Sequence, residues 1–396
     1  MLPLLLVVLA VPAKGAAMQK PSLPPRAAVF VVGADREQAS AAEVLEVKLS
    51  SALEEAKVDL TDLESLFPAP AADESGAKLF AEAKKGFDDL DYEPALANAE
   101  KALEAFTAHP ESATAAALAD VHFFIGAVSM QLSGKAGAKK AQESFARALL
   151  FNPNLELNDE LYGKEAKKAF DKARQEVSAK GMGSLAVTSK PAGAAVTLRE
   201  KIIGLTPLAE PPSVPAGRHL VKLTRPGFVT TGSFADVSSS GATVDATLAP
   251  APGYGEAREV ASTLLTNGVG SGRVPPTAKK LAEVMKARFL VVAVKRGDDT
   301  PLEVWDVETG NRLGDVALTD DVSLAAAAAR VKDFVDQPSP LAPVAAAEVE
   351  QGGGAPVYKK WWFWTAVGVV AVGTATAVGV AAASSRPGYN VVLGTP

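Results

Sequence analysis

The spacing of hydrophobic and polar residues changes several times along the chain, and each change marks a segment with a different expected structure. Residues 27–33 form a short apolar run that is typical of a buried strand. Residues 37–56 then carry apolar side chains at the spacing of an amphipathic helix. This pattern predicts a strand–helix unit over residues 27–67, which ends before the linker Pro68–Pro70.

From residue 72 to residue 180 the periodicity is helical, with helices expected near 74–89, 92–107, 113–133, 137–150 and 163–179. Small residues and one aromatic residue recur there at a spacing that lets paired helices pack closely, and a proline follows them. These residues are Ala141, Phe145, Ala148 and Pro153. On them the region resembles a short tetratricopeptide array, which implies a concave platform for a protein or peptide. A plain helical bundle is the alternative.

At Gly183 the pattern changes from helical to alternating, and short strands separated by Gly and Pro turns are expected up to residue 250. An ordered set of turn and strand residues runs through this segment: Pro191, Gly193, Ala194, Val196, Gly204, Thr206, Pro207, Gly217, Gly227 and Phe228. On this set residues 183–250 resemble a PEGA domain. The resemblance implies a small all-β sandwich of bacterial envelope proteins, with a binding role and no catalytic residues. Arg199-Glu200-Lys201 replaces the usual Asp-Gly-type turn, so that hairpin is longer or its tip makes a different contact.

Residues 254–335 predict a small α/β unit with helices near 255–266 and 276–287, a strand at 288–294 and a final helix at 322–335. A hairpin with a Gly-Asn turn is expected across residues 301–318. Acidic residues gather near this hairpin, and we expect them to mark a turn and a solvated strand face: Asp298, Asp299, Glu303, Asp306 and Glu308. The pattern leaves open whether residues 27–67 and 254–335 form one domain.

The two ends of the chain carry apolar segments of different length. Residues 1–17 fit a signal peptide, because the apolar run after Met1 is too short to span a bilayer and small residues follow it. Residues 361–383 hold no charge and are long enough to cross a bilayer as one helix. Basic and aromatic residues suited to a membrane interface stand at its start: Lys359, Lys360, Trp361, Trp362 and Trp364.

The predicted span, Trp361–Ala383, makes membrane lipid an expected partner, and its small residues suggest weak self-association. Residues 336–358 form a flexible Pro/Ala/Gly linker, and residues 384–396 form a short tail. A cleaved signal places the large region outside the cytoplasm. The two lysines before the span favour the opposite orientation. That tendency governs short loops more than long translocated domains, so we expect the signal to determine the orientation.

The composition excludes several kinds of chemistry. The chain has 396 residues and no cysteine, so disulfides and thiolate catalysis are absent. Its three histidines show no metal-ligand spacing, and the net charge of −6 gives no reason to expect nucleic acid. Known nucleotide-binding and hydrolase motifs are also missing. We therefore expect no catalytic, metal or cofactor site.

These observations predict a multidomain α+β protein in the bacterial cell membrane, with a single anchor and a periplasmic body. It would be a non-enzymatic binding protein that recognises an unknown protein or cell-surface partner. The first alternative is a regulatory protein with a cytoplasmic body. The second is an envelope hydrolase without recognised motifs.

Overall fold

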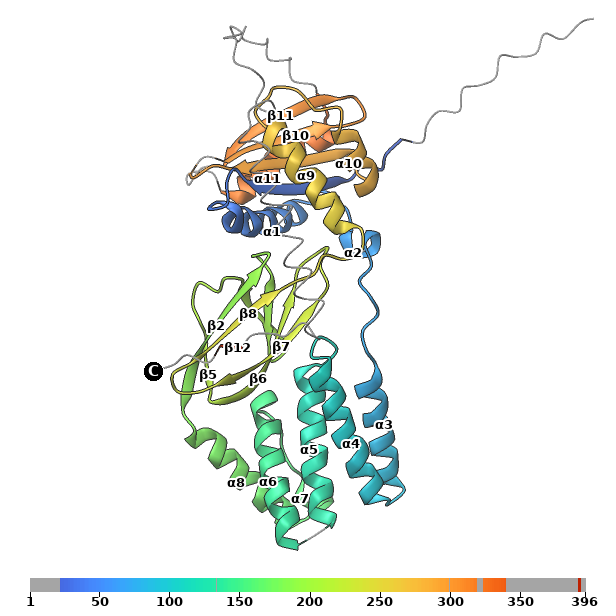
Figure 1. The fold of residues 1–396 in the computed structure, drawn as a ribbon, viewed down its shortest axis with the longest axis vertical. Coiled ribbons are helices and arrows are strands. Elements are labelled where there is room, and N and C mark those ends of the chain that lie inside the picture. The colour runs from blue at the N-terminus through green and yellow to red at the C-terminus, as the bar shows by residue number, and fades with distance from the viewer. Residues whose placement is uncertain (1–21, 133, 299, 319–322, 340–390, 393–396) are drawn as a thin grey trace, which may run out of the picture.

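The structure is a computed structural model, and it shows a mixed α+β chain (Figure 1). It describes residues 22–132, 134–298, 300–318, 323–339 and 391–392. The predicted signal segment 1–17, the linker from residue 340 onward and the predicted span 361–383 with its interface residues lie outside the described residues. Three units stack along the long axis. An α/β unit lies at one end, a β-sandwich in the middle and a group of helices at the other end (Figure 1).

The α/β unit is built from both ends of the described chain. Its first part contributes β1 (Ala27–Gly33), α1 (Ala39–Glu55) and α2 (Leu63–Leu66). The second part contributes α9 (Tyr254–Gly268), α10 (Ala278–Met285), β9 (Phe289–Lys295), β10 (Thr300–Asp306), β11 (Asn311–Leu318) and α11 (Leu324–Asp336). Because β1 pairs in parallel with β9, residues 27–67 and 254–335 share one sheet, of order β1-β9-β10-β11. The helical unit and the sandwich are therefore inserted into this α/β unit.

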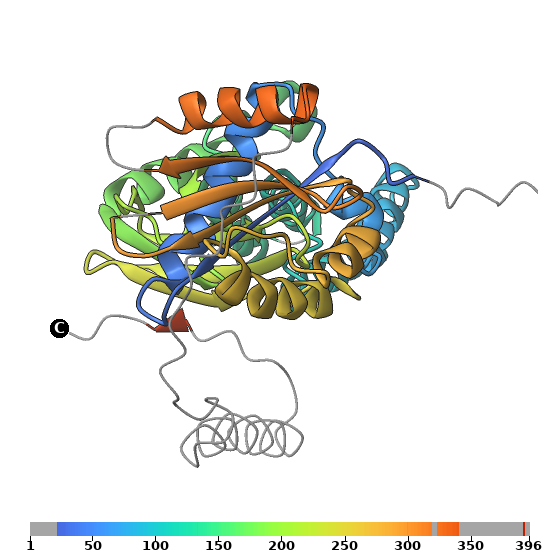
Figure 2. The same cartoon turned by 90° about the horizontal axis from the view of Figure 1, so that it is seen from above.

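Helices cover both faces of this sheet (Figure 2). On one face α9 and α10 pack over alternate strand residues such as Phe30, Leu290 and Trp305. On the other face α1 and α11 pack over the intervening residues, such as Val31 and Val291. Burial on both sides explains why β1 and β9 read as continuous apolar runs.

Two acidic residues of the β10–β11 hairpin do not lie on the solvated strand face that the sequence predicts. Glu303 and Asp306 are buried, with 2% and 1% of their surface exposed, so β10 does not present them on a solvated face. Glu303 accepts hydrogen bonds from Trp305 Nε1 at 2.6 Å and from the amide of Gly270 at 2.9 Å. Arg288 pairs with Asp306 at 2.7 Å. Burial alone would raise the pKa of the Asp306 carboxyl, but its bond to Arg288 holds that pKa below the usual value. Both carboxylates are thus bonded within the fold.

The helical unit contains antiparallel neighbours packed through small residues. Its helices are α3 (Ser75–Asp88), α4 (Tyr92–Ala108), α5 (Ala115–Leu132), α6 (Gly134–Phe151), α7 (Asp159–Tyr162) and α8 (Lys164–Ala179). Ala141, Phe145 and Ala148 are fully buried on α6, and Pro153 is exposed in the turn after it. A Cβ on Gly126 of α5 would lie 2.6 Å from the Phe145 ring, so the glycine allows this close contact. Among the described residues, α5 has the length and apolar character of a membrane span, but its buried residues pack in this unit.

The middle unit is a β-sandwich of two sheets. Its strands are β2 (Met182–Lys190), β3 (Ala195–Leu198), β4 (Lys201–Leu205), β5 (Ser213–Pro215), β6 (Gly217–Thr224), β7 (Thr231–Val237) and β8 (Ala242–Thr247). One sheet contains β8, β2 and β5 in that order, and the other has the order β4-β3-β6-β7. Alternate residues such as Leu185, Val196 and Val244 fill the core between them.

The strand β12 (Val391–Val392) comes from the far end of the chain and pairs antiparallel with β8. A membrane-inserted helix at residues 361–383 would place this tail across the bilayer from the sandwich. The pairing and the insertion of the span therefore exclude each other.

Candidate functional site at the interdomain junction

A buried glutamate marks the place where the α/β unit meets the sandwich. The buried residues of α1 are Ala42, Glu46, Leu49 and Leu53, which follow the spacing of one helix face. Glu46 is only 6% exposed. A carboxylate in this position needs partners, because burying an unpaired charge costs several kcal/mol or more.

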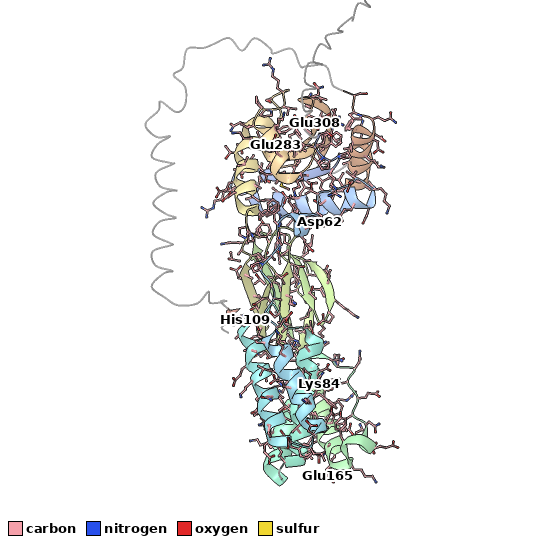
Figure 3. All side chains as sticks on the ribbon, turned by 90° about the vertical axis from the view of Figure 1, so that its right-hand side faces the viewer. Asp62, Lys84, His109, Glu165, Glu283 and Glu308 are labelled. Atoms are coloured by element: carbon pink, nitrogen blue, oxygen red, sulfur yellow. The ribbon has the colours of Figure 1, made fainter. Side chains whose placement is uncertain are left out.

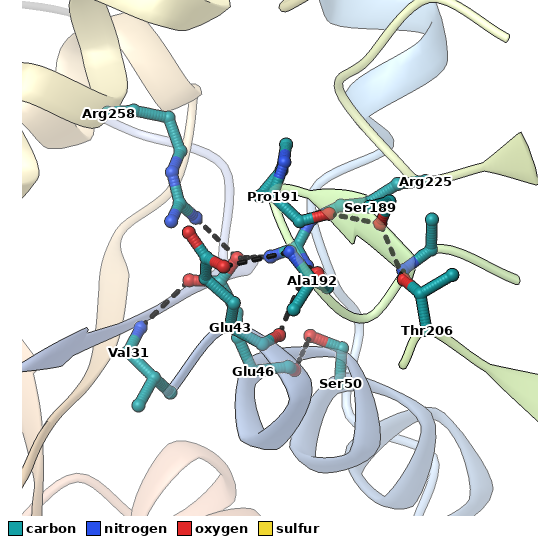
Figure 4. A network of polar contacts seen from close by, with 11 residues as sticks. Val31, Glu43, Glu46, Ser50, Ser189, Pro191, Ala192, Thr206, Arg225 and Arg258 are labelled. Atoms are coloured by element: carbon teal, nitrogen blue, oxygen red, sulfur yellow. Dashed lines mark hydrogen bonds and ion pairs between the residues drawn. The ribbon is translucent and has the colours of Figure 1, made fainter. Parts of the chain in front are cut away.

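The Glu46 carboxylate joins three parts of the molecule (Figure 4). One oxygen accepts a hydrogen bond from the amide of Val31 in β1 at 2.9 Å. The other pairs with Arg225 of the sandwich at 3.0 Å and with Arg258 of α9. Burial opposes the charge on Arg258, but the adjacent Glu46 and Tyr254 raise its pKa above the usual value. The charge on Glu46 is thus matched by two guanidinium groups.

Arg225 extends this network into the sandwich. It is 4% exposed, and its guanidinium donates to the carbonyl oxygens of Ala192 and Glu43 as well as to Glu46. The side chain of Glu43 accepts from the amide of Ala192 at 2.8 Å. The turn after β2 is therefore bonded to the first half of α1 by both backbone and side-chain groups (Figure 4).

Sandwich residues singled out from the sequence shape this turn. Gly193 has φ +78°, and a Cβ there would lie 2.9 Å from the carbonyl oxygen of Glu43, so only glycine fits without strain. Thr206 is fully buried, and its hydroxyl accepts a hydrogen bond from the amide of Ala194 at 2.9 Å and shares one with the Ser189 hydroxyl.

Other expected PEGA residues lie in the same connection or in the core. The peptide bonds that precede Pro191 and Pro207 are cis. Ala194 and Val196 lie in the sandwich core.

Gly227 and Phe228 make a second contact with the α/β unit. A Cβ on Gly227 would lie 2.3 Å from the ring of Tyr254 at the start of α9. The Phe228 ring meets Tyr254 edge to face, with centroids 5.5 Å apart, and Phe67 lies 5.3 Å from the same ring. Aromatic burial therefore reinforces the polar network.

The opposite end of the sandwich contacts the helical unit. Arg199 and Glu200 both have positive φ and form a two-residue turn between β3 and β4, so this hairpin is short and its tip makes a new contact. Glu200 accepts a hydrogen bond at 2.6 Å from the amide of Ala115, the first residue of α5. Arg199 Nε donates to the carbonyl of Leu150 at 3.1 Å, and a Cβ on Gly217 would lie 2.4 Å from that leucine side chain. A carboxylate at a helix N-terminus is favourable, because the exposed amides carry partial positive charge.

A cavity of about 420 Å³ opens beside the Glu46 network. It is lined by α1, β1, residues 58–64 and Arg225–Pro226, with Tyr254 and Met285. Two of its carboxylates have other roles: Asp59 pairs with Arg26, and Asp62 caps α2. Within the described ranges no group of three or more His, Asp or Glu side chains is arranged to hold a metal ion. The cavity can accept a small ligand, and its wall offers Glu46 only as a neutralised group.

Comparison with known families assigns the middle unit. A PEGA domain model matches residues 182–250. The chain contains a PEGA domain. This confirms the resemblance inferred from Pro191 to Phe228. Searches of curated proteins and of solved structures each found no match.

Sequence reasoning missed the residues that join the PEGA domain to the α/β unit. Glu43, Glu46, Arg225 and Arg258 were not among the expected site residues. One signal was present, because Glu46 interrupts an otherwise apolar helix face. Its partners could not be read locally, since Arg225 and Arg258 follow it by 179 and 212 positions.

Proposed function

We propose that this protein is a non-enzymatic, membrane-anchored bacterial envelope protein that binds a protein or cell-surface component through its helical region and its PEGA domain. The central position of the PEGA domain carries the proposal. At one end it is bonded to α1 and packs its Phe228 ring on Tyr254 of α9, and at the other end it is bonded to α5 and α6. Such an arrangement suits a rigid binding body, because preorganised surfaces lose less entropy on binding.

The helical region is set far from the α/β unit along the long axis of the molecule (Figure 3). It resembles a tetratricopeptide array, and a predicted flexible linker joins the α/β unit to the predicted span. In this arrangement the helices and the PEGA domain form the part most distant from that linker. Confinement near a membrane would raise the local concentration of such a binding surface.

Photo-crosslinking in cells tests the binding proposal. Leu90 in the turn after α3 and Ile202 in β4 are 69% and 70% exposed, and Val284 on α10 is a matched exposed apolar residue of the α/β unit. Each position receives a photo-reactive aromatic amino acid in the full-length protein. We expect adducts with a macromolecule from Leu90 or Ile202 and none from Val284. Adducts confined to Val284, or none from any position, would contradict the proposal.

Anchoring and orientation need their own test. The full-length protein is expected to stay with membranes after carbonate washing, whereas a variant without residues 361–383 is released. Insertion of the span would also withdraw residues 391–392 from β8. Protease digestion after the outer membrane alone is opened supports the periplasmic body. Resistance until the inner membrane breaks supports the cytoplasmic alternative.

A further inference from the structure

A second cavity lies between the helical unit and the PEGA domain, away from the Glu46 network. Its volume is about 370 Å³, within the usual range of small-molecule sites of about 300–1,000 Å³. Side chains of α4, α5, α6, β6 and β7 line it. Much of the wall is apolar: Leu103, Leu118, Leu150, Phe151 and Phe234. The cavity can thus hold an apolar group out of water.

Positive charge dominates the polar part of the wall. Arg147, Lys180 and Arg218 line the cavity, and Asp236 is the single carboxylate among its lining residues. In the described part of the chain these three cations have no ion-pair partner, although the Arg218 guanidinium lies 4.5 Å from the centroid of the Phe234 ring. An anion in the cavity would supply the counter-charge that they lack there.

His122 is a largely buried side chain that makes no hydrogen bond to another residue in the described structure, and its ring nitrogens are not among the fully enclosed unpartnered atoms. It lines the cavity, is 5% exposed, and stacks parallel to the Phe151 ring with centroids 5.8 Å apart. Buried polar groups in proteins are nearly always bonded to protein, water or ligand. Burial, together with Arg147 and Arg218, lowers the pKa of His122 to about 4, so the ring is neutral at pH 7 and has one N–H to donate.

We propose that this cavity binds a small organic anion with an apolar body. Its carboxylate or phosphate group would be held by Arg147 and Arg218, with a hydrogen bond from His122. The apolar body would lie against Phe151 and Leu118. Arginine suits this role, because its planar guanidinium donates two parallel hydrogen bonds to either group. The site is separate from the macromolecular binding proposed above.

Titration calorimetry on the full-length protein in a non-ionic detergent tests the site. The probes are phenyl phosphate, benzoate and uncharged benzyl alcohol. We expect at least one of the two anions to bind, with a stoichiometry of one molecule per chain, and we expect no binding of benzyl alcohol. Tighter binding of phenyl phosphate would assign the site to phosphate, and tighter binding of benzoate would assign it to carboxylate.

Matched substitutions identify the residues. Arg147→Gln and Arg218→Gln alter exposed side chains, so both variants should fold. Each should weaken binding at least tenfold, because it removes a charge and the charge-assisted hydrogen bonds that the charge makes. Arg273→Gln, an exposed arginine of the α/β unit, should leave affinity unchanged. In the unmodified protein the bound anion should shift the NMR resonances of the His122 ring.

Several results would overturn the proposal. One is the lack of binding of both anions at millimolar concentration. Another is equal weakening by Arg273→Gln, which would indicate general attraction by surface charge. Binding without any change at the His122 ring would place the anion elsewhere.

Discussion

Replacing Glu46 with glutamine should weaken the junction between the α/β unit and the PEGA domain more than any exposed charge change on α1. The substitution keeps the shape of the side chain and its bond to the Val31 amide, but it leaves the Arg225 guanidinium buried without a counter-charge. Breaking a buried ion pair costs about 3–5 kcal/mol. Because Arg225 keeps its bonds to two carbonyl oxygens, we expect about 3 kcal/mol, the lower end of that range.

Urea unfolding followed by circular dichroism measures the change in the free energy of unfolding, and hydrogen exchange of residues 27–33 reports on β1. Glu54→Gln is the control, because Glu54 is exposed on the same helix, and it should change stability by less than about 0.5 kcal/mol. Replacing Glu46, Arg225 and Arg258 together by methionine should recover only part of the loss, since no buried charge then remains but the Val31 amide and two carbonyl oxygens lose these partners. If Glu46→Gln and Glu54→Gln unfold at the same urea concentration, the reasoning is wrong.

Two further predictions concern His122 and Gly227. The His122 pKa falls from 6.5 to about 4 on folding, so the unfolded chain binds the proton first. Acidification from pH 7 to pH 5 should therefore cost about 2 kcal/mol of stability through this residue. In pH-dependent urea unfolding, His122→Asn should reduce the slope by that amount and leave the part due to His219, whose pKa burial also lowers, whereas His109→Asn at an exposed site should not reduce it. Gly227→Ala should destabilise the protein by about 2–4 kcal/mol in the same assay, because the new Cβ would clash with Tyr254. Gly310→Ala is the control, because Gly310 has a similar positive φ but open space around it, and it should cost only about 1 kcal/mol. Equal effects of the two alanine substitutions would show that backbone strain alone decides the outcome.

The PEGA strands and the helices were predictable because their patterns are local. Alternation along β2 buries Leu185 and Val187 in the core between the sheets, as the sequence indicates. Helix ranges such as Tyr92–Ala108 lie close to those expected from periodicity. Each of these features depends on residues within a few positions of one another, so the sequence carries it directly.

The junctions were not predictable in the same way. The strands β1 and β9 pair across more than 250 residues, and no local pattern shows that both belong to one sheet. Buried carboxylates raise a similar difficulty, because Glu303 stands in an acidic segment that is typical of solvent exposure. Its partners include Trp305 two positions away and Gly270 thirty-three positions away. Only the folded chain brings these donors together, and their hydrogen bonds offset the cost of burying the Glu303 carboxylate.

The PEGA residues recognised from the sequence have a second role here, which explains the central position of the domain. Gly193 and Gly227 lie in connections between strands and Gly217 begins β6, and at each of them a Cβ would collide with a neighbouring unit. Gly193 approaches α1, Gly227 approaches Tyr254 of α9, and Gly217 approaches Leu150 of α6. The absence of a side chain thus permits the close approach of another unit. The PEGA domain therefore contacts both of its neighbours through backbone that carries no side chain at these three positions, which brings the units closer than a larger residue would allow.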